Sequence, residues 1–222
     1  APSPLDGVRP AEYLSFIEKR RKILSAKYPN KRLIFPAGSQ KVRSNDTYFK
    51  FRAHTEFTYY TGITAKDVNP DSVLILEPNG SGHDALLFVH PRSPRDSEEF
   101  YRNAKYGEFW IGRRMTLEET EFAYEIKVRH IDSLTEFLSN KKDSLTLRGE
   151  DTFVDSCIAE SDSDNDFVTW LSEARLIKDQ FEIAEMQKAI DATYRGFEAM
   201  IREIPSAVGK KRGERLIEGA FF

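Results

Sequence analysis

Short apolar runs alternate with helical patterns through residues 1–162, and this alternation limits the folds that the chain can adopt. The runs KRLIFPAG, DSVLILEP and ALLFVHP are short and end near proline or glycine, as buried strands do. The segment from Pro10 to Tyr28 repeats apolar residues at helical spacing, and Thr116 with Glu119 forms a capping box before another helix. The sequence therefore predicts an α/β domain, a mixed β-sheet flanked by helices, in which the second and third runs form a hairpin.

The pattern becomes entirely helical after residue 162. The segment DFVTWLSEARLIK is typical of one helix. No strands follow that could cover the apolar stripe of the next helix. We expect residues 163–222 to begin a second, incomplete domain, and the chain to be part of a longer protein, because it stops within the helical pattern GERLIEGAFF. The stripe runs at helical spacing until Pro205 and consists of Ile183, Met186, Ile190, Phe197, Ile201 and Ile204.

Composition argues against two kinds of partner. Charged residues make up 31% of the chain with a net charge of -3, so there is no excess of basic side chains for nucleic acid. No window approaches the roughly 18 apolar residues that a membrane-spanning helix needs. A single cysteine, Cys157, excludes an internal disulfide and is typical of a reducing compartment. We expect a cytoplasmic protein in which Cys157 is a half-buried small residue rather than a nucleophile.

The segment YFKFRAHTEFTYYTG, Tyr48–Gly62, carries six aromatic residues, one histidine and one glutamate. Alternation over Tyr48–Arg52 predicts a half-buried strand, and the residues before Gly62 predict a short helix capped by that glycine. His54 and Glu56 are its only candidate metal ligands, and they would point to opposite sides of a strand. We therefore interpret this segment as scaffold rather than as a metal site.

Two further patterns resemble metal sites only in part. Asp162, Asp164, Asp166 and Glu173 stand at positions one, three, five and twelve of a calcium loop. Phe167 occupies the position where that loop requires glycine, so a polar linker with a helix cap is the better interpretation. The four histidines lie in separate elements without the spacing of a ligand pair: His54, His83, His90 and His130.

Three segments together resemble a known family. They are RSNDTYFKFRAHTEFTYYTGI, EFWIGRRM at Glu108–Met115, and EARLIKDQFEIAEMQKAIDAT at Glu173–Thr193. They resemble the amino-terminal part of Xaa-Pro aminopeptidases, whose relatives in fold are prolidase and creatinase. The resemblance implies an amino-terminal α/β domain at residues 1–162, followed at 163–222 by the first helices of a truncated pita-bread catalytic domain.

The resemblance also implies a metal centre that this chain lacks. Members of the family hold two divalent metal ions, usually manganese, with two aspartates, one histidine and two glutamates. Nothing in the chain matches these ligand segments, so we expect no metal ligands and no catalytic residues here, and we expect the chain alone to be inactive. The parent protein would remove the amino-terminal residue from peptides with proline in second position.

Two residues match positions that contact substrate in such enzymes. In bacterial members the amino-terminal domain helps to assemble a homo-oligomer, and a loop of one subunit can approach the active site of another. By position, Asp46 and Trp110 resemble those contacts: Trp110 could wall a substrate pocket, and Asp46 could attract the free amino group of the peptide. The alternative is that Trp110 lies in a strand or turn as a packed indole.

Two other functions fit the same resemblance. The pita-bread architecture also occurs in interaction modules without a metal site, and a prolidase-type dipeptidase differs from an aminopeptidase mainly in substrate length. The short loops and the FWIGRR run favour the aminopeptidase over the interaction module.

Overall fold

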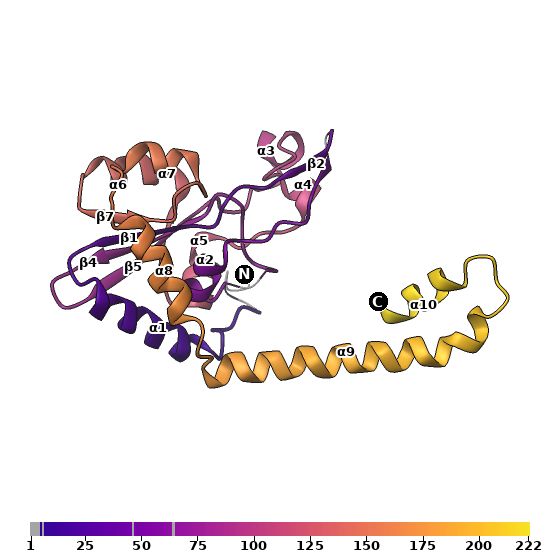
Figure 1. Cartoon of the computed structure of the whole chain (residues 1–222). Coiled ribbons are helices and arrows are strands. Elements are labelled where there is room, and N and C mark those ends of the chain that lie inside the picture. Colours follow the sequence, from indigo (N-terminus) through magenta and orange to yellow (C-terminus); the bar gives the residue numbers. More distant parts are fainter. Residues whose placement is uncertain (1–4, 6, 46, 64) are drawn as a thin grey trace. The chain divides into compact units, whose positions relative to one another are not determined.

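The computed structural model describes residues 5, 7–45, 47–63 and 65–222. The chain divides into two compact units, Ala1–Ala174 and Arg175–Phe222. The first contains the sheet and most of the helices, and the second consists of two helices (Figure 1).

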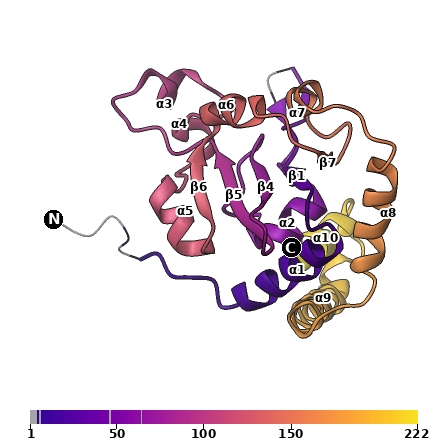
Figure 2. The ribbon, with the colours of Figure 1, turned by 90° about the vertical axis from the view of Figure 1, so that its left-hand side faces the viewer.

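A five-stranded mixed sheet forms the centre of the first unit (Figure 2). In space its strands follow the order β6-β5-β4-β1-β7. The three central strands pair in antiparallel fashion, and β4 and β5 form the expected hairpin, whereas β6 and β7 add in parallel at the two edges. The strands are β1 (Arg32–Pro36), β4 (Val73–Pro78), β5 (His83–Val89), β6 (Lys127–His130) and β7 (Ser144–Thr146).

Helices cover both faces of this sheet, which gives three layers (Figures 1 and 2). Successive residues of β1 point to opposite faces, so that Leu33 and Phe35 enter one core cluster and Ile34 the other. The larger cluster lies beneath α1 (Leu14–Lys27), α2 (Thr55–Thr61), α5 (Leu117–Tyr124) and α8 (Asp164–Ala174). The smaller one lies beneath α6 (Leu134–Ser139), which follows the turn η1 (Ile131–Ser133), and α7 (Thr152–Cys157). The predicted α/β class with a mixed sheet is confirmed.

Three short elements extend beyond one end of the sheet (Figure 1). They are the helices α3 (Glu98–Arg102) and α4 (Glu108–Ile111) and the hairpin of β2 (Val42–Ser44) with β3 (Thr47–Tyr48). Tyr48 of the hairpin and Glu98 of α3 line the same shallow pocket, so the hairpin and α3 are neighbours.

The first helix begins later than the sequence predicts. Its pattern starts at Pro10, but α1 starts at Leu14. The Ala11 N–H donates to the carbonyl of Ala123 at the end of α5, 3.0 Å away. This bond holds the segment before Leu14 against α5 and outside the helix.

The strand predicted over Tyr48–Arg52 is wrong beyond Tyr48. β3 contains two residues and its partner β2 three, and beyond them the hairpin is continued by a bond from the Phe49 N–H to the Lys41 carbonyl at 3.0 Å. The chain then returns to the core, where the His54 N–H donates to the Ala37 carbonyl at 2.9 Å, and α2 follows. The cap at Gly62 is confirmed, with a left-handed φ of 75°.

Helix α8 packs in the first unit, although the sequence suggested a second domain from residue 163. Phe167 and Leu171 have 0% exposure and lie in the larger core cluster. The predicted helix through Lys178 ends at Ala174, and the compact units divide there. The start of a catalytic-type domain at residue 163 stays a prediction.

The second unit is a pair of helices, α9 (Gln180–Ala207) and α10 (Gly213–Phe221). α9 begins with a capping box of Asp179 and Glu182 and contains Pro205 in its last turn. Phe221 of α10 packs edge-on against Phe197 of α9, with 5.6 Å between ring centroids. The apolar stripe predicted from the sequence remains largely exposed on α9. No helix within the described part of the chain is long and apolar enough to cross a membrane.

Candidate functional site

Trp110 lies on α4, a single helical turn beyond the end of the sheet where α3 and the β2–β3 hairpin also lie. Its indole is 59% exposed, and Nε1 donates to the carbonyl of Tyr101 at 2.7 Å. The interpretation of a packed indole in a strand or turn was therefore wrong. The residue has its polar edge fixed and its ring open to solvent, next to the exposed ring of Phe109.

The position of α4 is fixed by two close contacts. Glu108, only 8% exposed, accepts a bond from the Arg114 N–H at 3.1 Å and lies 3.4 Å from the Arg92 guanidinium. A Cβ on Gly107 would lie 2.5 Å from the carbonyl oxygens of Glu99 and Asn103. Only glycine fits at this point, where the start of α4 meets the end of α3. The short helix that carries Trp110 is thus braced on both sides.

A half-buried polar network lies close to these helices. The Tyr106 hydroxyl donates to Asp71, which also pairs with Lys105, and the Tyr106 ring stacks on His90 with 4.2 Å between centroids. Burial, followed by the bond to Asp71, raises the pKa of Tyr106 above its ordinary value. Burial alone would raise the pKa of Asp71, but hydrogen bonds from Lys105, Ser39 and Tyr106 outweigh it and lower the pKa. Tyr106 therefore stays a protonated donor that ties α3 and α4 to the sheet.

Asp46, the other predicted substrate contact, lies outside the described residues. The described neighbours on β2 and β3 are exposed, and Thr47 Oγ1 donates to the Ser44 carbonyl at 2.6 Å. The roles of Asp46 and Trp110 stay predictions.

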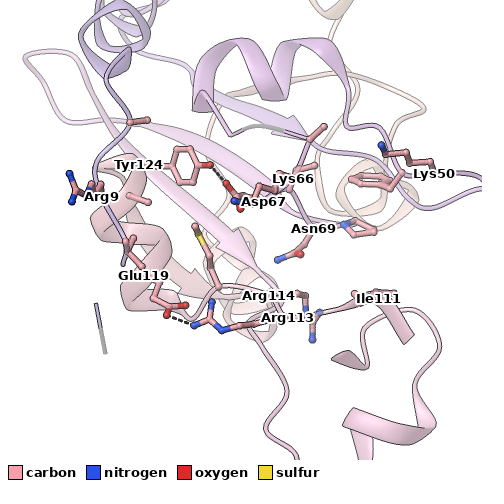
Figure 3. A pocket seen from close by; sticks show the side chains of 18 of the residues that line it. Arg9, Lys50, Lys66, Asp67, Asn69, Ile111, Arg113, Arg114, Glu119 and Tyr124 are labelled. Atoms are coloured by element: carbon pink, nitrogen blue, oxygen red, sulfur yellow. Dashed lines mark hydrogen bonds and ion pairs between the residues drawn. The ribbon is translucent and has the colours of Figure 1, made fainter. Parts of the chain in front are cut away.

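A cavity of about 1190 Å³ lies in the first unit, and the two sequence segments singled out above both contribute to it (Figure 3). Lys50 and Phe51 come from the segment after β3, and Ile111, Arg113 and Arg114 come from the EFWIGRRM run. Sequence reasoning did not find this cavity. Its walls come from segments far apart in the chain, and no spacing within one segment signals it.

The cavity wall carries more cationic than anionic side chains. Figure 3 shows Arg113 directed at Glu119 and Tyr124 directed at Asp67. Burial by itself raises the pKa of Glu119, but the Thr116 backbone bond and Arg113 outweigh it and leave the pKa lowered. Glu119 is therefore an anion that neutralises one of the cations.

Within the described ranges, no three His, Cys, Asp or Glu side chains come together as a metal site would require. His54 is the N-cap of α2, where Nδ1 accepts the Glu56 N–H at 3.3 Å, which supports the scaffold interpretation. Asp164, from the incomplete calcium pattern, is buried and accepts bonds from Arg148 at 2.8 Å and Ser161 at 3.2 Å. The fold does bring His90 and His130 together, with 5.8 Å between ring centroids, which their spacing in the sequence did not suggest.

Comparison with known proteins identifies the family. The family model for the aminopeptidase P N-terminal domain matches residues 16–147. Xaa-Pro aminopeptidase 1 of Streptomyces coelicolor is 38% identical over 226 residues, which covers 100% of this chain and 45% of that protein. Xaa-Pro aminopeptidase 2 of the same organism is 36% identical over 217 residues, covering 96% of this chain and 45% of that protein.

The solved structures agree on the fold. Aminopeptidase P from E. coli in its low-pH form superposes with a TM-score of 0.70 at 20% identity, covering 94% of this chain and 49% of that one. The chain thus spans less than half the length of the curated relatives that it matches. On the match of the domain model and the identity to these relatives, the chain belongs to the family of the aminopeptidase P N-terminal domain.

Proposed function

We propose that this chain is the amino-terminal, non-catalytic portion of a metal-dependent Xaa-Pro aminopeptidase. Two relatives named Xaa-Pro aminopeptidase carry the proposal. They are 38% and 36% identical to the chain, and the match covers only 45% of the length of each relative. The parent protein would remove the amino-terminal residue from peptides with proline second. It would act in the cytoplasm, in keeping with the free thiol of Cys157.

The metal ions of such an enzyme would be held by residues outside this chain. The described residues offer no cluster of ligands that fits two divalent ions such as manganese. When bound, the ions would activate water and polarise the scissile carbonyl.

The part proposed for this chain is to shape the substrate site and to support a homo-oligomer. The exposed indole of Trp110 offers a flat apolar wall, and its bond to Tyr101 fixes the plane of the ring. A carboxylate at Asp46 would attract the free amino group of a peptide. Both residues would reach a substrate across a subunit interface.

Variants of the complete protein test these roles. Trp110→Ala and Asp46→Ala should each lower kcat/KM roughly tenfold, the loss expected when about 1.4 kcal/mol of transition-state binding disappears. Bound metal, measured by elemental analysis, should stay unchanged. Phe153→Ala, which removes another exposed aromatic ring on α7, is the control and should retain full activity. Parental kinetics of both site variants on di-, tri- and longer Xaa-Pro peptides would show that the two residues are scaffold.

The chain by itself should not hydrolyse a Xaa-Pro peptide, even with manganese, cobalt or zinc in excess, since catalysis needs two ions and a base held together. Turnover that copurifies with the chain and disappears on mutation of residues within it would contradict the non-catalytic assignment.

A further inference from the structure

The cavity of Figure 3 carries an excess of positive charge. Two carboxylates line it, Asp67 and Glu119. Six cationic side chains line it: Arg9, Lys50, Lys66, Lys105, Arg113 and Arg114. A recess walled by protein focuses the field of such charges, so an anion inside it is attracted more strongly than at an open surface.

Only some of these cations are neutralised by the protein. Lys105 pairs with Asp71, and Arg113 pairs with Glu119. Arg9, Lys50 and Lys66 come from three separate segments, and none of them forms an ion pair with a carboxylate in the part of the chain that the structure describes. These three exposed cations form the rim of the cavity.

Arg114 adds a buried charge that lacks acceptors. Its side chain is 4% exposed, and Nε, Nη1 and Nη2 have no hydrogen-bond partner within the described residues. The nearest described carboxylate oxygen, on Glu99, is 3.9 Å from the guanidinium, beyond hydrogen-bond distance, and the Tyr106 ring lies 5.7 Å away. Burial lowers the pKa of Arg114, although Glu99 and Glu108 counteract this. A buried guanidinium that is only loosely paired is costly, and an anion nearby would reduce that cost.

The rest of the wall suits an organic molecule. Phe51, Ile111 and Met115 supply apolar surface, and Asn69 adds an amide. About 1190 Å³ exceeds what a single inorganic ion occupies.

We propose that this cavity binds a small organic anion with more than one acidic group, whose carboxylate or phosphate groups are attracted by the separate rim cations Arg9, Lys50 and Lys66 and by Arg114, and whose apolar part lies against Phe51, Ile111 and Met115. The site lies wholly in the first unit. It does not depend on the metal centre or on the peptidase activity of the parent protein.

Binding can be measured in the complete protein with citrate and inorganic phosphate as probes, by calorimetry and by thermal shift. Sodium chloride at matched ionic strength corrects for general screening. The test variant combines Arg9→Gln, Lys50→Gln and Lys66→Gln, all at exposed positions, so that folding is preserved. The control combines Lys19→Gln, Lys22→Gln and Lys27→Gln, which remove the same charge from α1 away from the cavity.

Citrate, phosphate or both should raise the Tm of the parent and of the α1 control beyond the effect of chloride. The rim variant should bind roughly tenfold more weakly, since it loses three charge contacts. Preference for one probe identifies the acidic group as carboxylate or phosphate. The proposal is overturned if chloride stabilises as well as either probe, or if the α1 control loses as much affinity as the rim variant.

Discussion

Gly62, the left-handed cap of α2, shows how one residue can join two elements of the core. A Cβ at this position would lie 2.9 Å from Cγ1 of Ile17 and 3.0 Å from the ring of Tyr13. The Tyr13 hydroxyl donates to the Gly62 carbonyl at 2.7 Å, so α2 and the start of α1 meet at this glycine. The position requires both the φ of glycine and its lack of a side chain.

Replacing Gly62 should therefore destabilise the chain more than replacing a glycine that also has a positive φ but has no atoms near the place of an added Cβ. Gly62→Ala should cost about 2–4 kcal/mol, from left-handed strain plus overpacking. Gly80→Ala, at φ 87° with nothing within 4 Å, should cost about 1 kcal/mol. Urea denaturation of both variants checks this, and equal losses would contradict the proposed contact with α1.

Buried Arg32 of β1 forms an ion pair with half-buried Glu77 of the neighbouring strand β4. Arg32 is 1% exposed, and its Nε lies 2.6 Å from Glu77 Oε2, while Nη1 donates to the Asn140 carbonyl at 2.9 Å. Burial alone raises the pKa of Glu77, but hydrogen bonds from Arg32 and Lys142 outweigh burial and lower it. Loss of Glu77 would leave Arg32 without its carboxylate partner in the interior.

Glu77→Gln should destabilise the chain by about 1–3 kcal/mol at neutral pH, because it removes a charged partner of buried Arg32. Because the folded pKa is lower than the ordinary value of 4.5, the stabilisation is present above that value and is lost as the pH falls through the folded pKa. Unfolding free energies measured from pH 7 to pH 3 should show the difference from the parent shrinking below about pH 4.5. Glu18→Gln, in the exposed pair with Lys22, is the control and should leave the unfolding free energy unchanged within error. A constant difference across this pH range would contradict the ionised pair.

At the scale of elements, α8 shows that helical periodicity does not tell which unit a helix joins. Phe167 contacts Phe35 of β1, with 5.8 Å between ring centroids, and Tyr28 after α1, at 5.3 Å. The sequence pattern identified the helix but grouped it with the helices that follow. β7 covers part of its buried face, but Phe35 and Tyr28 lie more than 100 residues earlier in the chain, which local spacing does not reveal.

The stability of the first unit should therefore depend on α8. Phe167→Ala should cost about 3–5 kcal/mol, because it removes a fully buried ring. Val168→Ala, at the adjacent exposed position, should cost about 0.5 kcal/mol or less. Near-UV circular dichroism during denaturation, which reports the aromatic core, measures both. If both substitutions lowered the unfolding free energy by the same small amount, α8 would not contribute to the core of the first unit.

At the scale of the whole molecule, the pair of helices α9 and α10 leaves a large apolar surface uncovered. Ile183, Ile190 and Ile201 are 48%, 57% and 65% exposed, which is unusual for isoleucine along one helix face. Apolar surface of this extent favours association. In the complete protein we expect the remainder of the chain to cover it.

The isolated chain should therefore self-associate. Light scattering across a dilution series should show mass rising with concentration, driven by about 1.5–3 kcal/mol for each large apolar side chain that becomes buried. Ile190→Glu should shift the chain toward monomer, whereas Ala192→Glu, which adds the same charge elsewhere on α9, should not. If the unsubstituted chain stayed monomeric at all concentrations, the apolar stripe of α9 would not drive self-association.

Much of the fold was predictable because it depends on local pattern. The apolar runs became β1, β4 and β5, the second and third paired as the expected hairpin, and Thr116 with Glu119 formed its capping box. In the same way, the resemblance carried by three short segments identified the family. Residues close in sequence determine these features, whatever the rest of the chain does.

Tertiary structure decided the features that depend on distant partners. The exposure of Trp110 follows from how α3 and α4 brace each other, and the cavity exists because segments near Arg9, Lys50 and Arg113 converge. The same holds for the 0% exposure of Phe167. Spacing along the chain fixes which face of an element is apolar. Only the packing of elements separated by tens of residues decides whether that face is covered, and where charges of one sign gather.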